Sequence, residues 1–175
     1  MSSCLPGGEG TSFLHGNKFQ LNFTRVPYLQ YFCQAVNLPG VSLGEIQRNT
    51  PFVDIYSPGE KAIYEILNVT FIVDENLKSW FEIHDWIRAM TFPTTFEEYK
   101  GLNQLSPLAD KEFPQFSDAH LTILTSANNP NYRVKFIDCF PISLSSVMFS
   151  AMDGPDNIIT ADASFRFSYF NIDRM

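Results

Sequence analysis

Residues 160–170 carry the pattern that most restricts the fold, a strict alternation of apolar and polar side chains. Ala, Phe and Tyr occupy every second position from 161 to 169, and Thr, Asp, Ser and Arg fill the alternate positions from 160 to 168. A period of two is that of a β-strand with one face buried. The segment therefore predicts a strand that packs against a core. Its apolar face holds Ala161, Ala163, Phe165, Phe167 and Tyr169.

Similar patterns recur along the chain. Residues 19–24 alternate Phe and Leu with polar side chains, and the aromatic-rich residues 28–36 predict a second strand that reaches the turn Asn37-Leu38-Pro39-Gly40. Further strands are predicted at residues 41–49 and 63–73. A final pair, residues 120–125 and 132–140, flanks an Asn-Asn-Pro-Asn sequence that is typical of a hairpin.

Residues 50–62 contain Pro51, Pro58 and Gly59 and separate two predicted strands. Ser57-Pro58-Gly59-Glu60 is a good turn sequence, so the segment predicts a long hairpin tip that projects from the body.

One helix is predicted after residue 73. Asp74 and Glu75 are suited to its first turn, where acids complement the helix dipole. The residues that follow helical spacing are Leu77, Trp80, Phe81, His84 and Ile87, broadened by Ile83, Trp86 and Met90.

Two segments lack such patterns. Residues 1–16 are rich in Gly and Ser and predict a flexible arm, and residues 93–117 predict an irregular, Pro-containing loop. The remaining elements predict a mainly β fold, with two packed antiparallel sheets as a sandwich or small barrel and one flanking α-helix. The expected division is the arm, residues 1–16, and a single domain, residues 17–175.

Composition and charge exclude some classes of function. The net charge of −7 argues against a protein that grips nucleic acid, which needs clustered Lys and Arg. No apolar run approaches the roughly 18 residues of a membrane span. The aromatic share of 15% is high for so short a chain, which predicts that these side chains are buried in a core or between subunits.

The chain shows no pattern of catalytic or metal-binding residues. His15, His84 and His120 are scattered, and Cys4, Cys33 and Cys139 form no Cys-x-x-Cys pair. His84 is expected to be a core-edge histidine with one hydrogen bond, and Cys139, beside Asp138, a small buried hydrophobe rather than a nucleophile. The acid pairs Glu97-Glu98 and Asp153 with Asp156 are expected in solvated loops. No enzyme activity, cofactor, metal or small-molecule substrate is predicted.

Residues 33–90 resemble the contractile phage tail tube family, which shares its fold with the Hcp-like tube of type-six secretion. The resemblance rests on Cys33-Gln34-Ala35-Val36-Asn37-Leu38-Pro39-Gly40, Glu45, Pro58-Gly59, Val69-Thr70-Phe71-Ile72-Val73-Asp74-Glu75 and Phe81-Glu82-Ile83-His84-Asp85-Trp86-Ile87. It implies hexameric rings that stack into a hollow tube in the virion tail, assembled in the host cytoplasm. It also implies sheath and baseplate partners, and DNA that passes through the lumen without specific binding.

The same resemblance implies that the hairpin makes contacts between subunits. A tube-initiating or baseplate ring of the same fold is the alternative within the family. Outside it, a monomeric β-sandwich that binds glycans or a partner through Tyr28, Tyr31, Phe52 and Tyr56 remains open. The residues expected at the contacts are Arg48, Asn49, Thr50, Pro51, Phe52, Val53, Asp54, Ile55, Tyr56, Ser57, Pro58, Gly59, Glu60 and Lys61.

Overall fold

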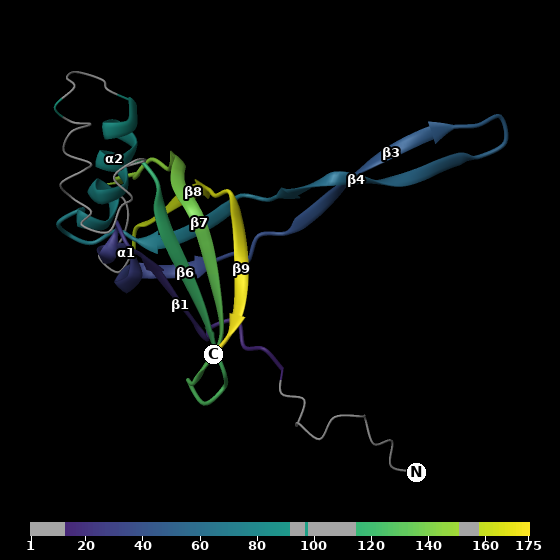
Figure 1. The fold of residues 1–175 in the computed structure, drawn as a ribbon. Helices are drawn as coiled ribbons and strands as arrows, with labels where there is room; N and C mark the ends of the chain where they lie inside the picture. Colours follow the sequence, from purple (N-terminus) through teal and green to yellow (C-terminus); the bar gives the residue numbers. More distant parts are fainter. Residues whose placement is uncertain (1–12, 92–96, 98–114, 151–157) are drawn as a thin grey trace, which may run out of the picture.

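The computed structural model describes residues 13–91, 97, 115–150 and 158–175. Within these ranges the chain forms nine strands and two helices, so the mainly β fold class is confirmed (Figure 1). Residues 1–12 of the predicted arm and most of the predicted 93–117 loop lie outside the described residues, and the division into arm and domain stays a prediction.

Seven strands form one antiparallel arrangement that folds over into two layers. The first layer has the order β1-β6-β7-β9, and the second runs from the far end of β7 through β8 and β5 to β2. The strands are β1 (Phe19–Phe23), β2 (Cys33–Val36), β5 (Leu67–Ile72), β6 (Ser117–Leu124), β7 (Pro130–Leu144), β8 (Thr160–Arg166) and β9 (Tyr169–Arg174).

Strand β7 belongs to both layers because it bends near Asp138. Asp138 has a φ of 55°, and the pairing of β7 passes from β9 to β8 across this position. The segment that pairs with this part of β7 is interrupted between β8 and β9, at Phe167 and Ser168. There the Ser168 hydroxyl donates to Asp138 Oδ2 at 3.1 Å. The predicted single strand at residues 160–170 is therefore two strands, one in each layer.

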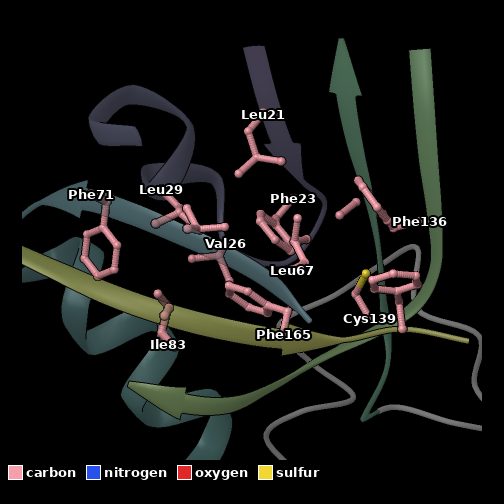
Figure 2. Close-up of a cluster of buried hydrophobic side chains, with 14 of the residues drawn as sticks. Leu21, Phe23, Val26, Leu29, Leu67, Phe71, Ile83, Phe136, Cys139 and Phe165 are labelled. Carbon is pink, nitrogen blue, oxygen red and sulfur yellow. The ribbon is translucent and has the colours of Figure 1, made fainter. Parts of the chain in front are cut away.

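A single hydrophobic core fills the space between the layers (Figure 2). Phe23 of the first layer and Phe165 of the second approach to 4.6 Å between ring centroids, and both are buried. The predicted apolar face of residues 160–170 is confirmed from Ala161 to Phe167, whereas Tyr169 is 45% exposed because it lies beyond the break.

Helix α1 (Pro27–Phe32) corrects the prediction of a strand from Tyr28. Proline suits the first turn of a helix, since its missing N–H has no partner there in any case. Leu29, in the middle of this helix, is completely buried, and only Cys33–Val36 pairs as a strand, with β5.

Helix α2 (Lys78–Thr91) begins four residues later than Asp74. Asp74 still caps it, because its Oδ1 accepts hydrogen bonds from the backbone N and the hydroxyl of Ser79 at 3.1 and 3.0 Å. The buried face is centred on Ile83 and Trp86, and Phe81 of the predicted stripe is 46% exposed. The described helices include none long and apolar enough to cross a membrane.

Candidate assembly interface

A two-stranded hairpin leaves the body as a separate element. Strands β3 (Val41–Asn49) and β4 (Asp54–Tyr64) pair with each other and with no other described strand (Figure 1). The turn lies at residues 50–53, so the predicted turn at Ser57–Glu60 is wrong. The projection of the hairpin from the body agrees with the prediction.

Pro58 and Gly59 lie in β4 at an irregularity in the pairing. The register moves two residues along β3, from Leu43 to Glu45, but four along β4, from Ala62 to Pro58. A Cβ on Gly59 would come within 2.5 Å of the Gly44 carbonyl oxygen, whereas a Cβ on Gly44 would meet nothing within 4 Å. The Pro-Gly sequence therefore marks a bulge, where an edge strand tolerates proline, and not a turn.

The base of the hairpin is fixed to the body by the Asn37–Gly40 segment. The Asn37 side chain donates to the Ile66 carbonyl at 3.0 Å and accepts from the Asn68 N–H at 2.6 Å. Gly40 accepts a hydrogen bond from the Glu65 N–H at 3.0 Å and donates its own N–H to the Glu65 carboxylate at 3.2 Å. These contacts hold both strands where they leave the second layer.

The hairpin exposes an unusual amount of apolar surface. Eight of its large hydrophobic side chains are more than half exposed. An isolated two-stranded hairpin is marginally stable in water, and unpaired strand edges promote association. Apolar surface exposed to this extent is characteristic of an interaction site. The eight residues are Val41, Leu43, Ile46, Phe52, Val53, Ile55, Tyr56 and Ile63.

The predicted contact residues all lie on this hairpin. Arg48 and Asn49 end β3, residues 50–53 form the turn, and residues 54–61 belong to β4. The prediction omitted the apolar part of β3, including Leu43 and Ile46, and the base of β4 at Ile63. The alternation of Val41 and Leu43 with Ser42 and Gly44 could have indicated the residues of β3. Their contacts with other subunits stay a prediction.

The aromatic residues of the alternative binding module do not gather into one platform. Tyr28 and Tyr31 belong to α1, on the flank of the body, whereas Phe52 and Tyr56 belong to the projecting hairpin (Figure 1). The geometry therefore does not supply the shared stacking surface that a glycan site needs.

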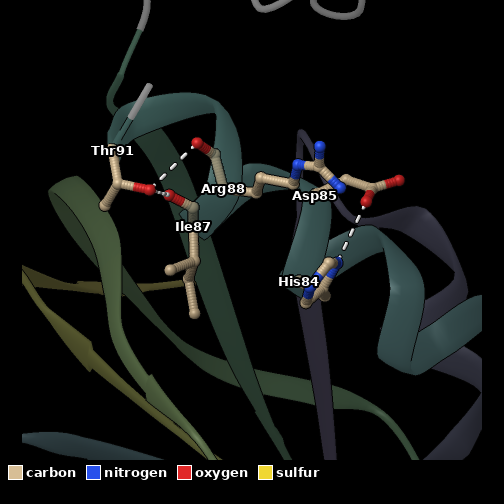
Figure 3. A network of polar contacts seen from close by, with 5 residues as sticks. All are labelled: His84, Asp85, Ile87, Arg88 and Thr91. Atoms are coloured by element: carbon tan, nitrogen blue, oxygen red, sulfur yellow. Dashed lines mark hydrogen bonds and ion pairs between the residues drawn. The ribbon is translucent and has the colours of Figure 1, made fainter. Parts of the chain in front are cut away.

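His84 lies on α2 beside Asp85 (Figure 3). Its ring is stacked on that of Trp80, with 5.0 Å between the ring centroids. Its Nδ1 is 3.1 Å from Asp85 Oδ1, and Thr91 nearby donates to the carbonyls of Ile87 and Arg88. This matches the expected partly packed histidine with one polar contact.

Cys139 is fully buried in β7, and burial raises the pKa of its thiol well above the ordinary value. A thiol held neutral is a poor nucleophile, which supports its interpretation as a packing residue. Among the described residues, no group of His, Cys, Asp and Glu could hold a metal ion. Glu98, Asp153 and Asp156 of the predicted acid pairs lie outside the described residues.

The fold is that of contractile-tail proteins of known structure. A protein of the six-fold-symmetrised baseplate of the anti-feeding prophage has a TM-score of 0.62 at 10% identity, over 93% of this chain and 96% of that one. The sheath/tube terminator of the extracellular contractile injection system PVC has a TM-score of 0.58 at 12% identity, over 94% and 99% of the two chains.

Sequence comparison identifies the family. The model of the phage tail tube protein family matches residues 9–173, and the chain belongs to that family. The tail tube terminator protein of Enterobacteria phage T4 is 26% identical over 144 residues, which are 81% of this chain and 76% of that protein. The chain is therefore a structural, non-enzymatic component of a phage tail, as the resemblance implied.

Proposed function

We propose that this chain is a tail tube terminator, whose copies close into a ring at one end of the tube. The projecting apolar hairpin is the main support for the proposal. In a monomer, the outer edges of β3 and β4 are unpaired and eight large hydrophobic side chains of the hairpin are exposed. Likeness to the phage T4 tube terminator and to the PVC terminator favours the end of the tube over its length.

Ring closure explains the shape of the subunit. The hairpin projects from one side of the body (Figure 1). A head-to-tail interface whose rotation closes gives a ring and covers the exposed edges. Six copies would match the symmetry of the related baseplate protein.

The solvated face of the second layer supplies a surface suited to line the channel. Thr70 donates to Asp162 at 2.6 Å, and Ser164 donates to Asn68 at 2.8 Å, so β5 and β8 present hydroxyls, an amide and a carboxylate. Such a face offers DNA little to bind, and the carboxylate repels phosphate. We propose that the outward face of β5 lines the lumen, and we expect tube protein, sheath protein and DNA to be partners.

Shortening the hairpin tests the proposal. Glu45 pairs with Pro58, so residues 46–57 can be replaced by a two-glycine turn without disturbing the base. The purified full chain should form rings by sedimentation and negative-stain microscopy, and the shortened chain should be a monomer with an unchanged thermal transition. Phe149→Ser, which removes an exposed apolar side chain outside the hairpin, should still form rings. Rings from the shortened chain would disprove the role of the hairpin.

A baseplate or tube-initiating ring is the second candidate, favoured by the likeness to the baseplate protein. The two functions differ in how they affect growth. Added to a polymerising tail tube protein, a terminator should bind one end and shorten the tubes as its concentration rises. An initiator should instead increase the number of tubes and remove the lag before growth. Long tubes formed by this chain alone would contradict both.

A further inference from the structure

An apolar cavity of about 350 Å³ opens where the chain enters β1. Its lining includes Phe13 and Leu14 on one side, and Ile123, Leu124, Ser126 and Tyr132 from the β6–β7 end on the other. Phe13 is 90% exposed and Leu14 is 73% exposed, so the described part of the chain leaves this arm-root pocket uncovered.

The tip of the hairpin presents a side chain suited to such a pocket. Phe52 is 99% exposed, more than any other large hydrophobic residue that the structure describes. Hydrogen bonds between Thr50 and Val53 hold the turn, so Phe52 sits on an ordered support. A side chain that is already positioned loses little further freedom on docking.

Size and charge agree between the two surfaces. An apolar cavity of about 150 Å³ can hold benzene, so the arm-root pocket has room for the Phe52 ring and the Val53 side chain. Asp54 follows the tip directly, and Arg174 lies across from Tyr132 on the same face of the sheet, at the side of the pocket. Opposite charges therefore flank the apolar contact.

The tip of one molecule cannot fill its own pocket. The hairpin extends away from the body, whereas the pocket lies at the end of the body where the C-terminus and the N-terminal segment meet (Figure 1). Contact between two different surfaces is heterologous, and such contacts generate rings when the rotation closes.

We infer that Phe52 and Val53 at the hairpin tip of one copy dock in the arm-root pocket of the next copy around the ring. The inference rests on the proposed ring and names the surface that receives the hairpin. The occupant is a second copy, because the chain itself carries both the apolar tip and an apolar pocket of matching size and flanking charge.

Two variants separate the donor from the acceptor. Phe52→Ser removes the tip side chain, and Ser126→Trp places a large ring at an exposed position in the pocket wall. Each should weaken ring formation at least about tenfold, the cost of losing a central contact. Phe149→Ser and Ser146→Trp are matched controls at exposed sites outside tip and pocket, and both should form rings. Thermal melting verifies that all four variants fold.

Mixing the two variants gives the decisive result. Ser126→Trp keeps an intact tip, and Phe52→Ser keeps an intact pocket. A 1:1 mixture at high concentration can therefore form one intact contact per pair of chains, so it should give heterodimers and no rings. Heterodimers in analytical ultracentrifugation support the inference.

Two outcomes overturn it: rings formed by Ser126→Trp alone with wild-type affinity, or rings formed by the mixture. Either would assign the pocket to another occupant, such as the N-terminal segment, and leave the ring itself standing. A wild-type chain that stays monomeric at every concentration would instead overturn the proposed function.

Discussion

The body and the hairpin of this protein use apolar residues in opposite ways. In the body, Phe71, Phe136 and Phe165 are completely buried between two layers. On the hairpin, Phe52, Ile46 and Ile55 are all more than half exposed although they are equally apolar. The core of the body therefore stabilises the single chain, whereas the apolar surface of the hairpin can be buried only by contact with another molecule. Stability and association should respond to different substitutions.

The largest expected effect comes from the centre of the body. Phe165 packs against Phe23 at 4.6 Å and lies 6.3 Å from Trp86, so Phe165→Ala removes contacts from both layers and a helix. We expect a loss of about 3–5 kcal/mol in the free energy of unfolding, measured with denaturant.

Phe52→Ala is the matched change on the hairpin. It should alter the free energy of unfolding of the monomer by less than about 0.5 kcal/mol, because the side chain leaves no cavity behind. If Phe165→Ala and Phe52→Ala destabilised the monomer equally, the hairpin would contribute to the stability of the single chain as the core does, and the comparison would fail.

A smaller effect is expected at the bulge of the hairpin. Gly59→Ala places a methyl group against the Gly44 carbonyl oxygen at 2.5 Å, so the two strands must separate or twist. The strain, about 1–3 kcal/mol, should weaken ring formation roughly tenfold, measured by sedimentation equilibrium, with the melting temperature of the body unchanged. Gly44→Ala is the control, because its Cβ meets open space. Similar association by both variants would show that the bulge does not set the hairpin geometry.

A modest effect, which depends on pH, is expected in the body at Glu82. Its carboxylate accepts a hydrogen bond from the Tyr28 N–H at 3.3 Å, yet burial, together with Asp74, raises the pKa of Glu82 from 4.5 to about 7. The folded state therefore binds the proton more tightly, and this contribution to stability is full below about pH 4.5 and is lost as the pH rises through 7.

Glu82→Gln should remove this dependence on pH. Discounted for the solvent access of the carboxyl, the variant should gain about 1 kcal/mol over the wild type at pH 8. Urea unfolding from pH 5 to 8 measures the difference, and ring formation, which depends on the hairpin, should not change. A parallel pH profile in the variant would assign the effect to another group.

The sequence pattern was sufficient for the strands that face both core and water. Residues 160–167 alternate because each second side chain enters the core, and residues 19–23 do so for the same reason. The alternation does not predict the interruption at Ser168. That interruption follows from the bend of β7 at Asp138, which is distant in the sequence.

The sequence placed the projecting hairpin in the right part of the chain, but the predicted geometry within the hairpin was wrong. Pro58 and Gly59 have the composition of a turn, and only their pairing opposite Gly44 and Glu45 places them in a bulge. Likewise, the residues Tyr28–Phe32 favour a strand by their aromatic content, whereas Pro27 at the first turn and the burial of Leu29 favour the helix. Tertiary contacts decided both cases.

The sharing of β7 between the layers has a consequence for how the body opens. A sandwich of two independent sheets can lose one sheet while the other persists. Here β7 pairs with β6 and β9 in the first layer and with β8 at the edge of the second, so the two layers cannot separate unless β7 loses its pairing in one of them. The body should behave as one cooperative unit, and the amides of β7 should exchange with deuterium only through global unfolding, long after those of the hairpin have exchanged.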